Sequence, residues 1–338
     1  MKIKRADIER ILILCAAVLV VVLALRGNPT TTSSVLIDDA QTSSVVVGGE
    51  QETLSTVVFY ADGDGYLVPV TRQIPKTDGI AKATLALMVK DSQNDLAAAK
   101  LGLQTVIPEG TTFEIDIKDG KARVDMSKEA LSCTSAEQET LMVQAVTGAM
   151  NCFATVDEVS LLVDGQARSQ LTYGTSVSGV FAEDYTNLEA TSADVSDAEM
   201  VKLYFPSQTG RLLVPVTRAV FSEADMTTAM VELAKGPQDD SGLERALPKD
   251  CGIRSVTMKD GVVTVDFSKE FAQVAQQSDG GKQSVRAILF TCSQFPGVKQ
   301  VKMTVEGAEF APAPETATTF INQESEVIAQ YPGVVELD

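Results

Sequence analysis

The sequence predicts an α+β protein with two tandem copies of one β(β)αββαβ sandwich domain behind an N-terminal transmembrane anchor. The hexapeptide LVPVTR occurs at 67–72 and again, letter for letter, at 213–218. Two further segments recur in the same order and at nearly the same offset. KDGKARVDMSKE (118–129) matches KDGVVTVDFSKE (259–270), and VDEVSLLVDG (156–165) matches VKQVKMTVEG (298–307). A repeat of this length indicates duplicated domains rather than the short units of a solenoid.

The composition excludes several classes of function. The 338 residues carry a formal net charge of −18 and include neither histidine nor tryptophan. An acidic surface repels nucleic acid, so we expect no nucleic-acid partner. Without histidine, neither a Ser-His nor a Cys-His nucleophile pair is available, and zinc has no imidazole ligand.

The first 26 residues have the pattern of a membrane anchor. Four basic residues precede an uninterrupted apolar run, 11–25, and an arginine follows it. We interpret 1–26 as a cytoplasmic stub with a retained single span in the cytoplasmic membrane, which places the bulk of the chain outside the cytoplasm. A cleaved signal peptide is the alternative, but no A-x-A-like site follows the run. Lipidation of Cys15 is a third interpretation, disfavoured because Leu14 stands where the acceptor site needs a small residue.

The rest of the chain divides into a tether and two domains. Residues 27–53 are rich in Ser and Thr, show no helical period and are interpreted as a flexible tether. We expect the first domain at 54–190 and the second at 198–338, the latter including a C-terminal tail.

Each copy begins with two β-rich runs around a Gly-containing turn, TVVFYADGDGYLVPVTRQI and VKLYFPSQTGRLLVPVTRAV. Pro69 and Pro215 lie inside the second run, which points to an edge strand or a bulge. Other chains add to a sheet at its edges. We therefore predict partner-binding edge strands made of Leu67, Val68, Pro69, Val70, Thr71, Arg72, Leu213, Val214, Pro215, Val216, Thr217 and Arg218.

A helix follows in each copy. The residues that recur at helical spacing in the second copy are Met226, Ala229, Met230 and Leu233. Those of the first copy are Ile80, Thr84 and Leu87. Ser222 with Asp225 resembles a capping box at the start of the second-copy helix.

The clearest local signal is a β-hairpin. In the first copy, apolar and polar residues alternate over 113–118, Asp119-Gly120 turns the chain, and alternation resumes over 122–126. Asp260-Gly261 does the same in the second copy. A two-residue Asp-Gly loop is typical of a tight hairpin.

A second helix and a last strand complete each copy. Ser135 with Gln138 can cap the helix of the first copy. Its expected buried stripe in the second copy consists of Val285, Ile288, Leu289 and Cys292. Strands with one polar face predict a sheet covered by helices on one side. The other face, wet or a contact surface, carries Glu114, Asp116, Arg123 and Asp125 in the first copy.

Carboxylates are the only candidate catalytic groups. Asp125 and Asp266 recur at equivalent positions, as do Glu129 and Glu270. A glycosidase needs two carboxylates roughly 5–10 Å apart across a cleft. These aspartates instead fall on the outward phase of a strand, so we favour structural roles and expect no enzyme activity, cofactor or metal site. DGDGY at 62–66 is interpreted as a plain turn, because a tyrosine takes the fifth position of a calcium-loop pattern.

The cysteines favour buried free thiols over disulfides. Cys133 and Cys152 flank a predicted helix and lie too far apart to bridge. Cys251 and Cys292 can pair, although nothing in the sequence requires it.

In order, LVPVTR, a helix ending near KGP (235–237), a KDG hairpin running into VDFSKE, a second helix and VxxVxxxVxG resemble the GerMN domain of sporulation and spore-germination proteins. The resemblance covers nearly all of 56–310. It implies a fold similar to the ring-building modules of secretion-system components. It also implies a non-enzymatic assembly role at the membranes around the forespore, with other membrane-anchored proteins as partners in a channel-like complex.

Two functions follow from these observations. The first is a membrane-anchored extracytoplasmic scaffold in sporulation or germination that recruits or stabilises a membrane-spanning complex. The alternative is a cell-wall-associated binding or sensory module that positions peptidoglycan hydrolases, which retention on purified peptidoglycan would reveal. A hydrolase using Asp125 or Asp266 is the least favoured.

Overall fold

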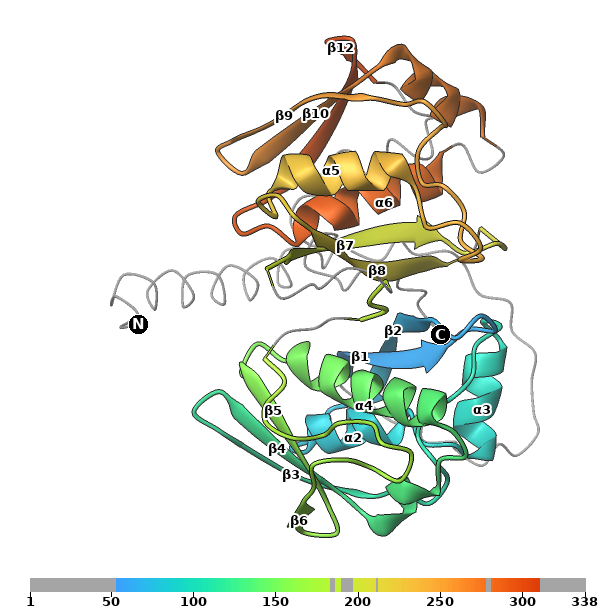
Figure 1. The fold of residues 1–338 in the computed structure, drawn as a ribbon, viewed down its shortest axis with the longest axis vertical. Coiled ribbons are helices and arrows are strands. Elements are labelled where there is room, and N and C mark those ends of the chain that lie inside the picture. The colour runs from blue at the N-terminus through green and yellow to red at the C-terminus, as the bar shows by residue number, and fades with distance from the viewer. Residues whose placement is uncertain (1–52, 183–185, 190–196, 211, 278–280, 311–338) are drawn as a thin grey trace, which may run out of the picture. The chain divides into compact units, whose positions relative to one another are not determined.

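The computed structural model describes residues 53–182, 186–189, 197–210, 212–277 and 281–310. The predicted anchor, nearly all of the tether and the C-terminal tail lie outside these residues, as does Cys15. Within the described ranges, no helix is both long enough and apolar enough to cross a membrane. The described chain contains two copies of a mixed α+β domain (Figure 1).

The two copies share their main elements. The first contains β1 (Thr53–Ala61), β2 (Leu67–Pro75), α2 (Ile80–Ala86), α3 (Ser92–Ala99), β3 (Phe113–Lys118), β4 (Lys121–Met126), a 3₁₀ turn (Lys128–Ser132), α4 (Ala136–Asn151), β5 (Glu158–Val163) and β6 (Gln166–Ala167). The second contains β7 (Glu199–Pro206), β8 (Leu213–Val220), α5 (Met226–Lys235), β9 (Ile253–Lys259), β10 (Val262–Phe267), a 3₁₀ segment (Lys269–Gln276), α6 (Lys282–Ser293), β11 (Gln300–Val305) and β12 (Ala308–Glu309).

Each copy has three layers, which corrects the expectation of one sheet covered on one side. β1 and β2 form a two-stranded antiparallel sheet of their own, separate from the four-stranded sheet β3-β4-β5-β6, and β7-β8 and β12-β11-β10-β9 repeat this arrangement. Figure 1 shows α2 and α4 between the two sheets of the first copy, and α5 and α6 between those of the second. The physical reason is that α4 is buried on more than one face. Val143 and Ala145 lie on nearly opposite sides of the helix and are both buried, and Gly148 packs against the Phe59 ring of β1.

The four-stranded sheets combine a hairpin with a parallel strand. β3 pairs antiparallel with β4, and β4 pairs parallel with β5 across the α4 crossover. Both Asp-Gly turns are confirmed. Asp119 and Gly120 have φ of 51° and 79°, and Asp260 and Gly261 have φ of 54° and 85°. Two successive positive φ values are the mark of a type I′ turn, which Asp-Gly adopts readily.

Of the two predicted N-terminal caps, the one of α4 is confirmed and the one of α5 is wrong. The Ser135 hydroxyl accepts a hydrogen bond from the Gln138 N–H (3.2 Å), so the predicted cap of α4 is confirmed. The capping box at Ser222 is wrong. The helix begins four residues later, at Met226, where the Asp225 carboxylate caps it by accepting from the Thr228 N–H (2.7 Å). A single carboxylate suffices for this role and also favours the positive end of the helix dipole.

The predicted buried stripes are largely confirmed. All four stripe residues of α6 are buried, as are Ala229, Met230 and Leu233 of α5, while Met226 is half-buried. In α2 the buried residues are Ala81, Thr84 and Leu85 rather than the full predicted set. The four described cysteines are free thiols, as the sequence favoured.

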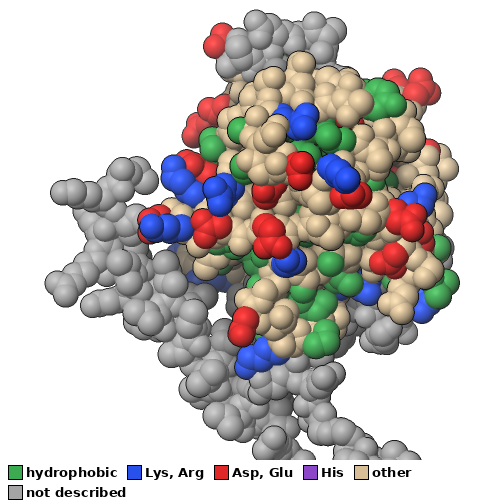
Figure 2. Space-filling view, turned by 90° about the horizontal axis from the view of Figure 1, so that it is seen from below, with side chains coloured by type: hydrophobic (Ala, Val, Ile, Leu, Met, Phe, Trp, Pro, Cys, Tyr) green, Lys and Arg blue, Asp and Glu red, His purple; other side chains and the backbone are tan. Residues whose placement is uncertain are grey.

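The face of each four-stranded sheet that points away from the helices is polar. In the first copy, Glu114, Asp116 and Arg123 are exposed, as predicted, and Asp125 is half-buried. Figure 2 looks at the molecule from below Figure 1, the end where β3, β4 and β6 lie, and shows acidic and basic side chains interspersed there. This face therefore largely neutralises its own charge.

Candidate functional site

The two LVPVTR segments form most of β2 and β8. Each is one strand of a two-stranded sheet and therefore an edge strand, as the prolines predicted. Pro69 stands opposite Phe59, whose N–H instead donates to the Met88 sulfur (3.1 Å). The Phe59–Pro69 pair is thus a non-hydrogen-bonded pair, and the proline costs the ladder no hydrogen bond.

Most side chains of the two segments are packed in the core. Leu67, Val68, Val70, Leu213, Val214 and Val216 are each at most 1% exposed. Packing is therefore the first explanation for the repeated hexapeptide, because an equivalent hairpin covers the equivalent helices in each copy. Partner binding at these strands stays a prediction.

Asn187, in the segment between the copies, joins the two LVPVTR strands. Its side-chain oxygen accepts from the Leu67 N–H (2.8 Å), and its side-chain NH₂ donates to the carbonyl oxygens of Leu67 (2.8 Å) and Pro215 (2.7 Å). Its φ of 53° is left-handed, a conformation that asparagine tolerates better than most residues. One amide therefore bonds a β2 residue 120 positions before it and a β8 residue 28 positions after it.

The residues beside Asn187 extend β8. Leu188 forms a parallel bridge with Thr217, and the Glu189 N–H donates to the Thr217 carbonyl (2.9 Å). The Thr217 hydroxyl donates to the Thr186 carbonyl (2.8 Å). This stretch of the edge of β8 is thus already occupied by the chain itself.

Arg218, the last residue of the second LVPVTR, lies in a buried ion-pair network. Its guanidinium bonds both carboxylate oxygens of Glu189 (2.5 and 2.8 Å) and one of Glu232 (3.3 Å). The side chains of Arg218 and Glu189 are 12% and 8% exposed. Burial alone would lower the pKa of Arg218, but the hydrogen bonds and charges of the two glutamates outweigh it and raise that pKa. This network fixes the linker to the second copy.

The equivalent Arg72 has neutral partners. Its guanidinium donates to the Tyr60 hydroxyl (2.8 Å), which itself donates to the Leu87 carbonyl (3.2 Å). In the second copy Phe205 takes the place of Tyr60, and the Arg218 guanidinium lies 5.8 Å from the centre of its ring. The same arginine in the same hexapeptide therefore has different partners in the two copies.

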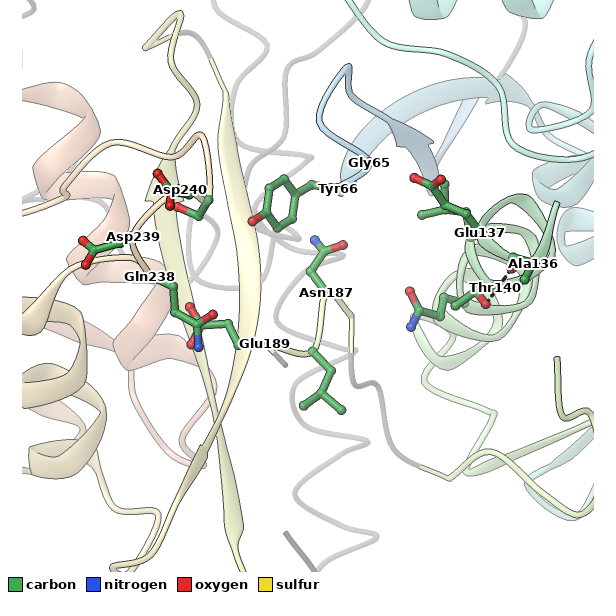
Figure 3. A pocket seen from close by; sticks show the side chains of 14 residues that line it. Gly65, Tyr66, Ala136, Glu137, Thr140, Asn187, Glu189, Gln238, Asp239 and Asp240 are labelled. Atoms are coloured by element: carbon green, nitrogen blue, oxygen red, sulfur yellow. Dashed lines mark hydrogen bonds between the residues drawn. The ribbon is translucent and has the colours of Figure 1, made fainter. Parts of the chain in front are cut away.

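A cleft of about 570 Å³ adjoins the Asn187 contacts. Its acidic lining residues are Glu137, Glu189, Asp239 and Asp240, and none of the described residues that line it is a lysine or an arginine. Figure 3 shows Tyr66 and Asn187 between the 238–240 loop on one side and α4 on the other. Burial, and then the nearby carboxylates Glu189 and Asp62, raise the pKa of the Tyr66 hydroxyl. The cleft is thus an acidic pocket at a junction of loops.

The DGDGY segment is a turn, as predicted. The Asp62 carboxylate accepts from the backbone N–H groups of Asp64 (3.0 Å) and Tyr66 (2.8 Å). Burial raises the pKa of Asp62. Among the residues that the structure describes, no three Cys, Asp or Glu side chains are grouped so that they could hold a metal ion.

The candidate catalytic carboxylates have structural partners. Asp125 accepts from the Gly165 N–H (3.0 Å), and Asp266 accepts from the Gly307 N–H (2.8 Å) and the Thr304 hydroxyl (2.7 Å). These last two bonds, with the hydroxyl first, lower the pKa of Asp266. Each aspartate thus holds the turn after the parallel strand against the hairpin.

The two glutamates also bond locally. The Ser268 hydroxyl donates to Glu270 (2.5 Å) and lowers its pKa, and Ser127 does the same for Glu129. Neither these glutamates nor the two aspartates line the acidic cleft.

Sequence reasoning missed the residues that organise this region. Asn187 and Glu189 lie at the end of the stretch that the sequence analysis assigned to the first domain, 54–190. No local pattern marks them, because their partners are distant in sequence. Glu139, whose buried carboxylate accepts from the Tyr173 N–H (2.9 and 3.0 Å), was also missed, since it reads as a polar residue of α4.

The fold defines a class: proteins made of two tandem copies of a three-layer α+β domain, joined by a linker that packs on the second copy. The chain belongs to the Germane family, whose model, described as "Sporulation and spore germination", matches residues 57–169 and 202–310. This finding confirms the family resemblance drawn from the repeated motifs.

Two relatives support the assignment. The spore germination protein GerM of Bacillus subtilis (strain 168) is 30% identical over 266 residues, which are 75% of this chain and 72% of that protein. The solved structure of the tandem GerMN domains of the sporulation protein GerM from Bacillus subtilis is 29% identical, with a TM-score of 0.66. That match covers 78% of this chain and 96% of the solved one. The predicted tandem α+β architecture is confirmed.

Proposed function

We propose that this chain is a non-enzymatic assembly protein that acts outside the cytoplasmic membrane in sporulation or spore germination. Residues 11–25 anchor it, and its two domains recruit or stabilise a membrane-spanning protein complex. The observation that carries the proposal is membership of the sporulation and spore germination family over both copies. The likeness to ring-building modules is part of the same proposal.

The chemistry of the described residues supports a role without catalysis. The recurring carboxylates that were the best catalytic candidates each hold a turn or a neighbouring serine, and none lines the acidic cleft. Burial raises the pKa of the Cys133 thiol to about 11, which removes it as a nucleophile near neutral pH.

The first test is the localisation of a functional fluorescent fusion in the native host from growth through sporulation. We expect signal only in sporulating cells, concentrated at the membrane around the forespore. Uniform envelope signal during growth would refute the sporulation role. If the purified protein were also retained on peptidoglycan, the wall-associated alternative would replace it.

A second test addresses the LVPVTR edge. Along β2, the backbone N–H and C=O groups of every second residue point away from β1. Those of Leu67 do so, and those of Thr71, four residues later, point the same way. Thr71→Pro removes one outward N–H and keeps the hairpin ladder, as Pro69 already does. We expect it to impair recruitment of complex partners to the forespore, while Thr71→Ala does not. Normal recruitment by a folded Thr71→Pro protein would exclude β2 as the partner-binding edge.

A further inference from the structure

The open faces of the two four-stranded sheets are equivalent in position but differ in charge. The charged residues of the first face are Glu114, Asp116, Asp125, Glu158, Lys118, Lys121 and Arg123. Those of the second are Asp266, Glu309, Arg254, Lys259 and Lys302. The first face therefore carries four acidic and three basic residues, whereas the second carries two acidic and three basic residues on a chain whose net charge is −18.

The strand registers show how the acidic side chains were replaced. Glu158 stands beside Lys121 in the first sheet, and Gln300 takes its place beside Val262 in the second. By the same registers, Thr257 takes the place of Asp116. At the place of Glu114, the bulge of β9 brings Arg254 and Ser255, and Lys302 stands where the first sheet has Ser160.

Of the two carboxylates of the second face, Glu309 lies on β12, at the opposite end of the sheet from β9, and Asp266 is already engaged. Asp266 bonds Thr304 and Gly307 and lies 3.5 Å from the Arg254 guanidinium. Lys259 and Lys302 make no ion pair with any described residue. In the first sheet, by contrast, Lys121 pairs with Glu158 at 3.0 Å. The second face thus has positive charge without a partner in the described chain.

The second sheet also has an open edge beside these cations. β9 is its outer strand and, among the strands that the structure describes, pairs with β10 alone. Lys259 and Val262 close the two-residue turn as a hydrogen-bonded pair, so the backbone groups of Val256 and Met258 point away from β10. Among the described residues these groups have no backbone partner. The Met258 side chain, on the same edge, is 44% exposed.

We propose that β9 binds an acidic, extended segment of a partner protein, which adds to the sheet as a further strand. Alternating N–H and C=O groups of an edge are satisfied by another backbone of the same repeat, which favours a peptide over a lipid or a phosphate polymer. Acidic side chains of the added strand lie against Arg254 and Lys259, and Lys302 adds to the positive field. This inference rests on the proposed function, because it names the chemistry of the recruited partner.

The test measures peptide binding to the full-length protein in a neutral detergent. The probe is a fluorescein-labelled eight-residue peptide in which glutamate alternates with valine, and its match replaces glutamate by lysine. Fluorescence anisotropy should show binding of the glutamate peptide alone. Lys259→Glu should weaken that binding about tenfold or more, whereas the matched Lys118→Glu in the first copy should change it less than about twofold. Binding of both peptides alike, or of neither, would overturn the proposal.

A second variant separates strand addition from charge attraction. Met258→Pro removes an outward N–H and leaves the basic side chains in place, and Ile117→Pro is its match on β3. With unfolding temperatures near that of the wild type, Met258→Pro should lose the glutamate peptide and Ile117→Pro should keep it. If Met258→Pro binds as the wild type does, while polyacrylate competes fully, the site takes polyanions in general and the proposed strand is wrong. The assay does not depend on sporulation, so its failure is distinct from a failed localisation experiment.

Discussion

Replacing Asn187 by glycine should uncouple the two LVPVTR strands. Glycine accepts the left-handed φ of 53°, so the substitution removes the side-chain hydrogen bonds without adding backbone strain. Asn187→Asp is the isosteric comparison. It keeps an acceptor for the Leu67 N–H and loses the donors to the carbonyls of Leu67 and Pro215.

The expected cost follows from three bonds of 2.7 to 2.8 Å. A net contribution of about 1 kcal/mol each sets an upper value of about 3 kcal/mol. The bonded groups are only partly buried and regain water when the side chain is removed, so we expect a loss of about 2 kcal/mol for Asn187→Gly. At about 2–4 °C per kcal/mol for a chain of this size, the unfolding temperature should fall by about 4–8 °C. The unfolding temperature of Asn187→Asp should lie between those of Asn187→Gly and the wild type.

Scanning calorimetry of the purified protein measures this directly, and two copies that separate should also give a broader or divided transition. Gln144→Ala, at another residue lining the same cleft, is the control and should shift the midpoint by less than about 1 °C. A shift for Asn187→Gly as small as that of the control would show that the contacts of Asn187 do not couple the copies.

Three further outcomes follow from individual residues. Gly120→Ala should lower the free energy of unfolding by about 1–2 kcal/mol, because φ at this position is 79° and the added methyl group meets the Asp157 side chain. Gly63→Ala is the control, since its methyl group would lie in open space, and it should be nearly neutral. Asp266→Asn should make the free energy of unfolding depend less on pH below about pH 4. A carboxylate whose pKa is lowered on folding stabilises the folded protein above its ordinary pKa, and this contribution is lost as pH falls through the lowered pKa. Iodoacetamide at pH 8 should leave three thiols unlabelled until urea is added, as mass spectrometry can verify, because burial raises their pKa to about 11, 11 and 12 for Cys133, Cys251 and Cys292.

The elements that could be predicted from sequence depend on local patterns. The Asp-Gly turns, the Ser135 cap and the stripe of α6 each involve residues within a few positions of one another, and all three are confirmed. Duplication strengthened these predictions, because a weak pattern in one copy had a counterpart in the other. The helix α3 escaped notice because its sequence, SQNDLAAA, buries only Asn94 and Ala98 and shows no apolar stripe.

The layer order and the linker contacts depend on distant pairs. Nothing within β1 and β2 shows that they leave the main sheet, since an apolar strand face can cover either a helix or another strand. The side-chain amide of Asn187 finds partners far along the chain on both sides, and the sequence around it resembles an ordinary linker. The candidate site could therefore be predicted as far as its edge strands and not as far as the residues that join them.

The two arginines of the repeated hexapeptide provide a matched pair for these arguments. Arg72→Ala removes a hydrogen bond to the neutral Tyr60 hydroxyl and should cost about 1 kcal/mol. Arg218→Ala leaves Glu189 buried without its cation, while Glu232 keeps its ion pair with Lys235, and the substitution should cost about 3–5 kcal/mol. Both variants change the same letter of LVPVTR, so composition and helix or strand propensity cancel in the comparison. Urea unfolding of the two proteins measures the difference. Equal losses would mean that the linker carboxylate Glu189 does not need Arg218, and the view that the second copy uses its hexapeptide to hold the linker would have to be abandoned.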